Sequence, residues 1–329
     1  MADADTLRIA SFHTTLSADG PGLLLADIVR GDDPVIDATL AVIARARADI
    51  VVLQDIDHDA EGLALAALAR ELAARGQDYP FRLTLRPNTG RPTGHDLDGD
   101  GHSHWRRDAH GFGGFNGAGG MALLSRHPIG PVTDFTATLW RDLPGSRAAE
   151  VTPEAALPVL RLATVGAWAV EIAVPGGPVT VLATHAGTPV FDGPEDRNGI
   201  RNADELRFWQ LVLDGWQPTP EWRLPDAFVL AGTLNVDPMS GEGHRDVLRA
   251  LLDHPGVQEV TPTGARGAAT ADWADPVPGD LRVDYILPAA TLTVTGHGML
   301  WPTADEDPAL HEMVGTASDH RLIWVDLSF

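Results

Sequence analysis

The sequence predicts an α/β fold in which layers of helix pack on β-sheet. Strand-like apolar runs alternate with helical stretches over residues 7–74, and the chain becomes rich in strands after residue 120. It contains no Ser/Gly linker, no shift in composition and no internal repeat. We therefore expect one domain over residues 1–329, whose two halves each supply a sheet.

The alternation begins with a strand at residues 7–16, written LRIASFHTTL. The stretch 34–48 has apolar residues at helical spacing and a proline at its start, where proline suits the first turn of a helix. Residues 49–57 form a short, nearly continuous apolar run, which is typical of a strand covered on both faces. The alanine- and leucine-rich stretch 61–74 predicts a second helix.

A long polar segment separates this opening from the strand-rich part. Residues 86–120 contain many Gly, Asp, His and Asn residues and little aliphatic material. A loop of this length inside a compact domain is usually functional or disordered. Beyond it we expect a helix at about 202–213 and strands at 120–129, 159–165, 168–174, 179–186, 227–235, 282–287 and 322–327.

Composition excludes several classes of protein. The chain has 329 residues, of which 44% are hydrophobic, so it can bury a large core without stabilisation by disulfides or a structural metal. It has no cysteine, which excludes a disulfide scaffold, a thiolate metal site and a cysteine nucleophile. No apolar run approaches the roughly 20 residues of a membrane span. The polar N-terminal stretch does not resemble a signal peptide; if the natural precursor is secreted, its signal lies outside this sequence, and no compartment is assigned.

Charge argues against one class of partner. The chain carries 46 acidic and 24 basic residues, a net charge of −22, and shows no basic stripe. A protein that follows a nucleic-acid backbone usually has a positive footprint, because counterion release drives that binding. We expect a monomer that acts on a small-molecule substrate and does not bind long nucleic acids, with a surface whose acidity favours solubility.

Seven motifs carry polar residues at or near strand ends. They are LRIASFHTTL (7–16), ADIVVLQDID (48–57), GMALLSRHPI (120–129), VTVLATHA (179–186), FVLAGTLNVDP (228–238), LRVDYILP (281–288) and SDHRLIWVDL (318–327). In this order the chain resembles the endonuclease/exonuclease/phosphatase superfamily of metal-dependent phosphoesterases. Segment 189–209 is similar to a bacterial branch of that family. The resemblance implies a four-layer α/β/β/α sandwich with two mixed sheets packed face to face.

The resemblance also implies roles for individual residues. Asp55 matches a carboxylate that holds a divalent metal, and His185 matches a histidine that donates to the phosphoryl oxygen. Asp284 supports that histidine or orients the site, and Asn235 touches the attacking water or the phosphate. In the final motif, Asp319 is expected to hydrogen-bond His320, the base or phosphate-polarising imidazole, and to contribute to the metal site. Hydrolysis of a small phosphodiester or phosphomonoester with Mg²⁺ or Mn²⁺ is the implied activity.

Three departures from the family pattern bear on that activity. Thr233 stands where the family has the aspartate that activates water, and a threonine is not a base near neutral pH. His13 replaces an asparagine at the end of the first strand, which substitutes an imidazole for an oxygen ligand and favours metals such as Zn or Fe. Asp55 replaces a glutamate and is shorter by about one methylene group.

These departures leave three interpretations open. The chain is a phosphoesterase with a rearranged site, a family member recruited to other chemistry with a transition metal at His13, or a catalytically inactive binding protein, either natural or engineered. The first is the favoured hypothesis, because Asp-His pairing and a metal-binding carboxylate are the groups that phosphoester hydrolysis needs.

The long loop offers a second candidate site. Asp96, Asp98 and Asp100 follow the D-x-D-x-D-G pattern of the first half of a calcium loop, although Arg107 stands where an EF-hand has glutamate. A structural Ca²⁺ on these three carboxylates is one interpretation, and a solvated acidic turn is the other. A third is a metal site made by the four histidines of the loop, which are His95, His102, His104 and His110.

Polar residues after the THA motif suggest a substrate-binding group. Arg197, Asn198 and Arg201 precede or begin the predicted helix, and their side chains suit binding of a phosphate or carboxylate. The alternative is that the arginines pair with Asp196, Asp204 or Glu205.

Overall fold

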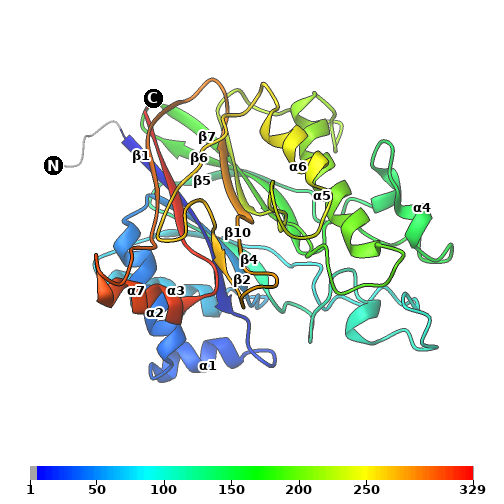
Figure 1. Cartoon of the computed structure of the whole chain (residues 1–329), viewed down its shortest axis with the longest axis horizontal. Coiled ribbons are helices and arrows are strands. Elements are labelled where there is room, and N and C mark those ends of the chain that lie inside the picture. Colours follow the sequence, from blue (N-terminus) through cyan, green and yellow to red (C-terminus); the bar gives the residue numbers. More distant parts are fainter. Residues whose placement is uncertain (1–5, 329) are drawn as a thin grey trace.

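The computed structural model describes residues 6–328 and places two β-sheets face to face at the centre of the molecule (Figure 1). The first sheet has the strand order β12–β13–β1–β2–β4–β3, with bounds Thr293–Met299, Ile323–Ser328, Thr6–Leu16, Ile50–Ile56, Gly120–Ser125 and Phe81–Thr84. The second has the order β11–β8–β7–β6–β5, with bounds Asp284–Pro288, Phe228–Thr233, Gly177–His185, Gly166–Val174 and Ile129–Asp134.

Both sheets are mixed. β1 runs parallel to β2, and β7 runs parallel to β8, whereas the other pairings within the two sheets are antiparallel. The carboxyl ends of parallel neighbours meet at one edge of a sheet. The polar residues near the carboxyl ends of β1 and β2 therefore lie close together in the first sheet, and those of β7 and β8 lie close together in the second.

Alternating side chains give each sheet two apolar faces. Between the sheets, Ile9, Ile50 and Val52 of the first belong to one buried cluster with Val181 and Val229 of the second. The outer face of the first sheet packs on α1 (Leu23–Arg30), α2 (Pro34–Ala46), α3 (Leu63–Ala74) and α7 (Pro308–Ala317). The outer face of the second packs on α5 (Arg197–Leu213) and α6 (Arg245–Leu252).

This arrangement confirms the predicted four-layer α/β/β/α sandwich. A two-stranded ribbon, β9 (Ala271–Asp272) with β10 (Asp280–Leu281), and short helical turns lie outside the layers. These turns are η1 (Arg106–Asp108), η2 (Trp140–Asp142) and α4 (Ala148–Val151). The division into one domain stays a prediction. No helix within residues 6–328 is long and apolar enough to cross a lipid bilayer.

One predicted strand is wrong. Residues 159–165 form an irregular segment with a single bridge, Arg161 to Leu139, although Leu160 and Leu162 are buried. Backbone bonds to η2 and its flank, such as that from the Trp140 amide to the Leu160 carbonyl, replace a ladder. The segment is a loop that covers the core, and it buries Leu160 and Leu162 at alternate positions. This alternation is what gave the sequence its strand-like pattern.

The inter-sheet core generates a stability prediction. Ile50 is fully buried, and Ile50→Ala should lower the free energy of unfolding by about 2–5 kcal/mol through lost burial and a residual cavity. Urea denaturation measures the change. Val29→Ala, at a position that is 68% exposed on α1, serves as the control and should change stability by less than about 0.5 kcal/mol. Equal effects of the two substitutions would contradict the assigned core.

Candidate functional site at the sheet edge

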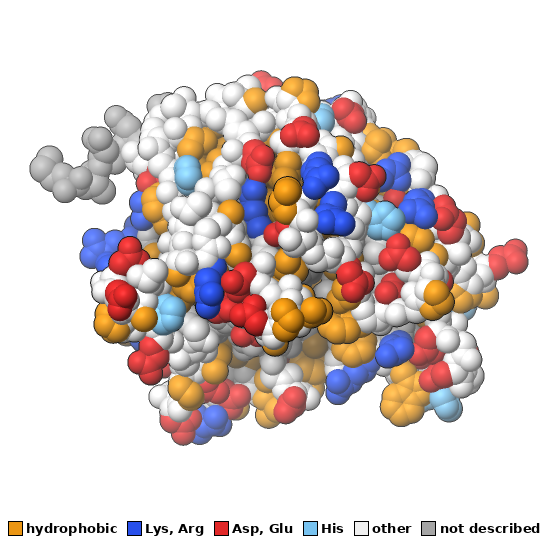
Figure 2. Space-filling model, viewed as in Figure 1, with side chains coloured by type: hydrophobic (Ala, Val, Ile, Leu, Met, Phe, Trp, Pro, Cys, Tyr) orange, Lys and Arg blue, Asp and Glu red, His pale blue; other side chains and the backbone are white. Residues whose placement is uncertain are grey.

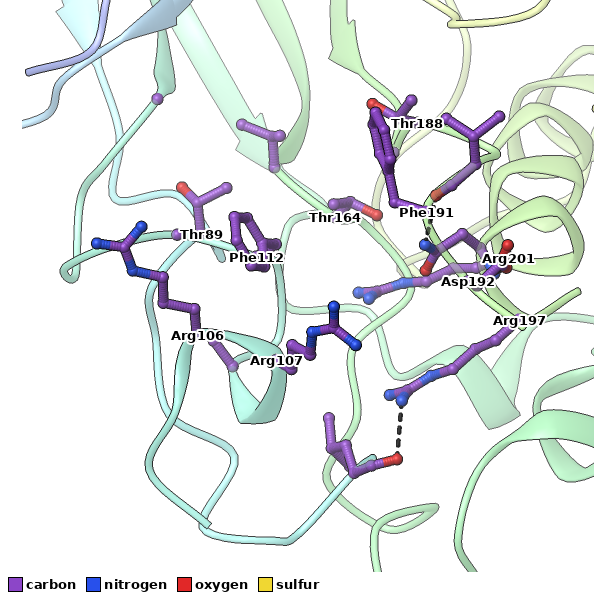
Figure 3. A pocket seen from close by; sticks show the side chains of 18 of the residues that line it. Thr89, Arg106, Arg107, Phe112, Thr164, Thr188, Phe191, Asp192, Arg197 and Arg201 are labelled. Atoms are coloured by element: carbon purple, nitrogen blue, oxygen red, sulfur yellow. Dashed lines mark hydrogen bonds between the residues drawn. The ribbon is translucent and has the colours of Figure 1, made fainter. Parts of the chain in front are cut away.

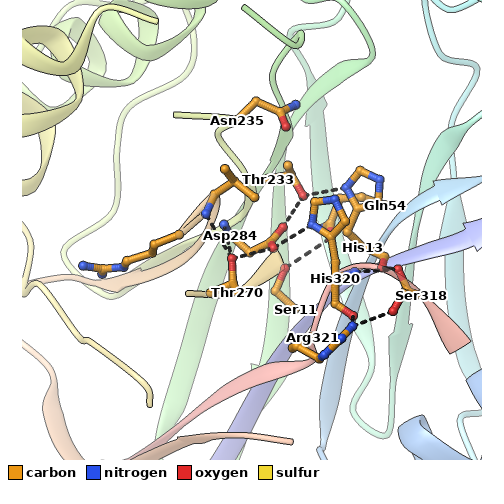
Figure 4. A network of polar contacts seen from close by, with 12 residues as sticks. Ser11, His13, Gln54, Thr233, Asn235, Thr270, Asp284, Ser318, His320 and Arg321 are labelled. Carbon is orange, nitrogen blue, oxygen red and sulfur yellow. Dashed lines mark hydrogen bonds and ion pairs between the residues drawn. The ribbon is translucent and has the colours of Figure 1, made fainter. Parts of the chain in front are cut away.

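Asp284 is the centre of a buried polar network at the edge of the second sheet (Figure 4). Its Oδ1 accepts a hydrogen bond from Thr233 Oγ1 at 2.6 Å. Its Oδ2 accepts from Thr270 Oγ1 at 2.8 Å and from His320 Nδ1 at 2.8 Å. The register of β11 against β8 places Asp284 directly opposite Thr233, which makes the first of these contacts possible.

Three histidines lie together beside this network. His13 Nδ1 lies 2.9 Å from Thr233 Oγ1, so the network extends from the second sheet to β1 of the first. The rings of His13 and His320 are stacked, with centroids 3.9 Å apart and an interplanar angle of 7°. His185, at the end of β7, meets His13 edge-on, with centroids 4.8 Å apart and an angle of 71°.

Two other residues of the site have left-handed backbone conformations. Asp55 has φ +52° and Asn235 has φ +61°, a region that Asp and Asn tolerate better than most residues. At Asp55 the pairing of β2 with β4 shifts its register, which sets this residue apart from the regular ladder. The Asn235 side chain donates to the Ala186 carbonyl at 2.8 Å and so fastens the end of β8 to the residue after His185.

Burial controls the protonation of these groups. It lowers the pKa of His185 to about 4, and it lowers the pKa of His13 well below its usual range, with His320 and His185 adding repulsion. Burial also raises the pKa of Asp55 to about 6, and the neighbouring Asp57 contributes to this shift. The imidazoles of His13 and His185 are therefore neutral near pH 7 and can accept a proton or bind a cation.

His13, Asp284 and His320 form a group that could hold a metal ion, because ligand atoms of all three lie within 4.8 Å of one another. Asp284 and the Nδ1 atoms of both histidines already take part in the hydrogen bonds described above. A metal at those atoms would compete with the network.

The structure corrects one predicted contact. The expected hydrogen bond between Asp319 and His320 is not formed: the Asp319 side chain is exposed, and the partner of His320 is Asp284. Consecutive residues of an extended segment point in opposite directions, so Asp319 faces away when His320 faces the site. Asp319 is also outside the group of possible metal ligands around His320. Asp284 thus orients His320, whereas the prediction linked it with His185.

The site opens into a large cavity. The cavity has a volume of about 1600 Å³, and His13, Asp55 and His185 contribute to its lining. Its wall includes the long loop of residues 86–120, which supplies Arg106 and Arg107 (Figure 3). The sequence analysis missed these two arginines as cavity residues. The available signal was the Arg-Arg pair inside a loop poor in aliphatic residues.

The predicted substrate-binding residues line the same cavity, but they are engaged with backbone carbonyls (Figure 3). Arg197 donates to the Leu97 carbonyl at 2.9 Å, and Arg201 donates to the Leu162 carbonyl at 3.0 Å. Asn198 donates to the Val190 carbonyl at 2.7 Å. The alternative ion pairs with three acidic residues are not seen among the described residues, since Asp204 pairs with Arg207 and Asp196 with His244, and Glu205 accepts from backbone amides. A role in substrate binding stays a prediction.

The acidic loop does not bring its three predicted carboxylate ligands together. Asp96 and Asp98 come together with the buried Asp108, whose ligand atoms lie within 4.8 Å of theirs, and Asp100 is outside this group. Asp96 accepts hydrogen bonds from the backbone amides of Gly99 and Gly101, as in a solvated turn. A structural cation on Asp96, Asp98 and Asp100 stays a prediction, with Asp108 as a fourth candidate.

Comparison with known proteins assigns the chain to a family. A sequence model of the Endonuclease/Exonuclease/phosphatase family matches residues 29–320, so the chain belongs to that family. Members of the family are metal-dependent phosphoesterases, among them nucleases, phosphatases and sphingomyelinases. No curated protein sequence matches the chain.

Several solved structures share the fold. An endonuclease/exonuclease/phosphatase from Beutenbergia cavernae is 23% identical with a TM-score of 0.60, over 99% of this chain and 72% of that one. Sphingomyelinase C from Streptomyces griseocarneus is 17% identical with a TM-score of 0.54, over 98% and 99%. A Staphylococcus aureus beta toxin variant with bound magnesium ions is 14% identical with a TM-score of 0.56, over 99% and 100%. At these identities the likeness shows the fold alone.

Burial of a neutral His185 predicts a pH dependence of stability. Its pKa is about 4 in the folded chain, against an ordinary value of 6.5, so between these values the unfolded chain binds a proton that the folded chain does not. Stability should therefore fall as pH drops from 6.5 to 4, by up to about 3 kcal/mol for this group. With chelator present, His185→Gln should remove this contribution to the fall in the free energy of unfolding between pH 6.5 and 4, as measured by urea denaturation. Identical pH profiles of the two proteins would contradict the assignment.

Proposed function

We propose that the chain is a divalent-metal-dependent hydrolase that cleaves a small phosphodiester or phosphomonoester at a rearranged active site. The observation that carries this proposal is the Asp284–His320 pair, whose imidazole stacks on His13, a residue that lines the cavity together with Asp55 and His185. An oriented imidazole next to a carboxylate that can bind a cation is the combination that phosphoester hydrolysis requires. Membership of a family of phosphoesterases supports the same reaction.

The hydrogen bonds support a role for each group. In the neutral tautomer of His320 that donates its Nδ1–H to Asp284, Nε2 carries the lone pair and can take a proton from water as the water oxygen attacks phosphorus. The bond from phosphorus to the leaving oxygen then breaks, and that oxygen receives a proton from a protonated imidazole or from solvent. A cation bound at Asp55 would neutralise charge on the phosphoryl oxygens. His185 lines the same cavity and could donate a hydrogen bond to the same oxygens.

The cavity wall carries basic side chains that suit a small anionic substrate. Arg107 extends into the cavity, and no carboxylate lies within ion-pair distance of Arg106 or Arg107 among the described residues (Figure 3). These guanidinium groups can therefore contact a phosphate. Over the face in Figure 2, acidic and basic side chains are interspersed.

A second candidate function is binding without turnover. The observation that favours it is Thr233, which is fully buried and hydrogen-bonded to both Asp284 and His13, so it cannot replace the missing aspartate as a base. Loss of such a base typically slows a reaction by about 10²–10⁴-fold. A protein of this second kind would bind its phosphoester and release it unchanged.

Turnover of bis(4-nitrophenyl) phosphate and 4-nitrophenyl phosphate tests the proposal. His320→Ala should lower kcat by at least about a hundredfold, because it removes the proposed proton acceptor. The matched control is His254→Ala, which removes another Asp-bonded histidine, partly buried beside Asp214 and outside the cavity lining, and should leave kcat unchanged. No turnover by the unmodified chain with any divalent metal, together with retained phosphoester binding, would favour the second candidate.

A double substitution tests whether the family chemistry is latent. Thr233→Asp with His13→Asn restores the two family residues and should raise Mg²⁺-dependent phosphodiesterase activity, because a carboxylate base and an oxygen ligand return together. The initial rate with bis(4-nitrophenyl) phosphate at fixed Mg²⁺ measures the effect. If the unmodified chain already matches the double variant, the departures at 13 and 233 have no functional consequence.

A further inference from the structure

His185 is held differently from the other two histidines of the site. Nδ1 of His13 and Nδ1 of His320 each have a hydrogen-bond partner in the network around Asp284. Nδ1 of His185 is buried and has no hydrogen-bond partner among the described residues. Its ring meets His13 edge-on, which is a packing contact. The position of His185 therefore depends on its backbone and on the side chains packed around it.

The backbone of the two residues after His185 is hydrogen-bonded at every polar group. The Ala186 amide donates to the Thr233 carbonyl at 2.9 Å, and the Ala186 carbonyl accepts from the Asn235 side chain at 2.8 Å. The amide and the carbonyl of Gly187 are both bonded by side chains of α5. Because β7 ends at His185, these bonds fix the chain where the strand stops.

Asn202 and Glu205, about one turn apart on α5, hold Gly187 at both ends of the residue. The Gly187 amide donates to Glu205 Oε2 at 2.7 Å, and Asn202 Nδ2 donates to the Gly187 carbonyl at 2.7 Å. Residues three apart in a helix share a face, so both side chains reach the same segment. Asn202 Nδ2 also donates to the Leu234 carbonyl at 2.9 Å. One amide group therefore joins the segments that follow β7 and β8.

The burial of Asn202 indicates that its two donors are what this position needs. Its side chain is fully buried, and its Oδ1 has no hydrogen-bond partner among the residues that the structure describes. A buried unpaired acceptor is unfavourable, and an apolar side chain would avoid that cost. An apolar side chain could not donate to the carbonyls of Gly187 and Leu234, and neither could an ionised aspartate.

Gly187 makes the close approach to α5 possible. A Cβ atom at position 187 would lie 2.5 Å from Thr164 Oγ1 and 3.3 Å from Glu205 Oε2, so a larger residue would push these groups apart. Thr164 is fixed by the same carboxylate, which accepts from its amide and from its hydroxyl. Gly187 and Thr164 both line the cavity, whereas Glu205 does not. Glu205 therefore acts on the cavity wall from behind.

We propose that Asn202 and Glu205 are positioning residues for His185, which they hold through Gly187 so that its imidazole can donate to the phosphoryl oxygens. This inference rests on the proposed function and adds to it two residues that do not line the cavity. A displacement of a reacting group by about 1 Å can slow a reaction about a hundredfold. Loss of either side chain should therefore affect the rate more than substrate binding.

The first experiment compares two amide-to-carboxylate substitutions on α5. Asn202→Asp keeps the shape but removes both donors, and it should lower kcat for bis(4-nitrophenyl) phosphate by about 10–100-fold while KM changes by less than about threefold. The matched control is Gln210→Glu, since Gln210 donates to the Val247 carbonyl at 2.7 Å and not to Gly187. The control should change kcat by less than about twofold.

A double-mutant cycle shows whether Asn202 acts through His185. In the His185→Ala background, Asn202→Asp should have no further effect on kcat, because the group that it positions is absent. Equal losses of kcat in both backgrounds would overturn the proposal. Circular dichroism checks that each variant is folded. If Asn202→Asp is not, Glu205→Gln provides the same cycle, because it leaves one oxygen where Glu205 uses two.

NMR of the histidine side chains separates this inference from the proposed function, because it does not require turnover. In the full chain with isotope-labelled histidine, the ring resonances of His185 are assigned from their loss in His185→Ala. The folded variant at 202 or 205 should shift these resonances, whereas Gln210→Glu should leave them in place. Unchanged His185 resonances in the folded variant would overturn the inference. Absence of turnover in the unmodified chain, with the expected shifts, would overturn the proposed function alone.

Discussion

The site depends on the need to satisfy one buried carboxylate. Asp284 is 2% exposed, and an unpaired charge at such a position would cost several kcal/mol. Its donors come from separate parts of the chain: Thr233 from the second sheet, Thr270 from the segment before β9, and His320 from the segment before β13. Through Thr233 the network reaches His13 on the first sheet. The hydrogen bonds that satisfy Asp284 therefore also connect the edges of the two sheets.

The sequence predicted the elements that carry the site because its polar residues follow apolar strands. Asp55, His185 and Asn235 lie at or just beyond the ends of parallel strands, and His13 lies at the last regular pair of β1 with β2, before the register shifts. The carboxyl ends of parallel neighbours share one edge of a sheet, so the sequence could predict that these residues come together. The partner of His320 was not predictable in the same way. Asp319 is its neighbour in sequence, but an extended backbone turns the two side chains apart, and Asp284 reaches His320 from 36 residues away.

The cavity wall shows a different limit of sequence reasoning. Arg106 and Arg107 lie in a loop without periodicity, so nothing in their spacing predicts where they point. The buried Asp108 accepts from the amides of Leu97 and Trp105 and thereby closes the loop around η1. Asp108 thus organises the loop that carries Arg106 and Arg107. In the sequence, this carboxylate is only one member of an acidic, His-rich tract.

The two main departures from the family pattern are physically coupled. Thr233 Oγ1 lies 2.6 Å from Asp284, and a carboxylate at 233 would set two negative charges against each other in a buried place unless a cation lay between them. Threonine removes that repulsion and supplies both a donor for Asp284 and an acceptor for His13. Asparagine at 13 could also donate to that acceptor, but its remaining oxygen is a hard ligand, whereas the imidazole keeps a nitrogen lone pair for the cavity. The pair at 13 and 233 therefore forms one arrangement, in which the threonine hydroxyl joins the buried carboxylate of Asp284 to the imidazole of His13.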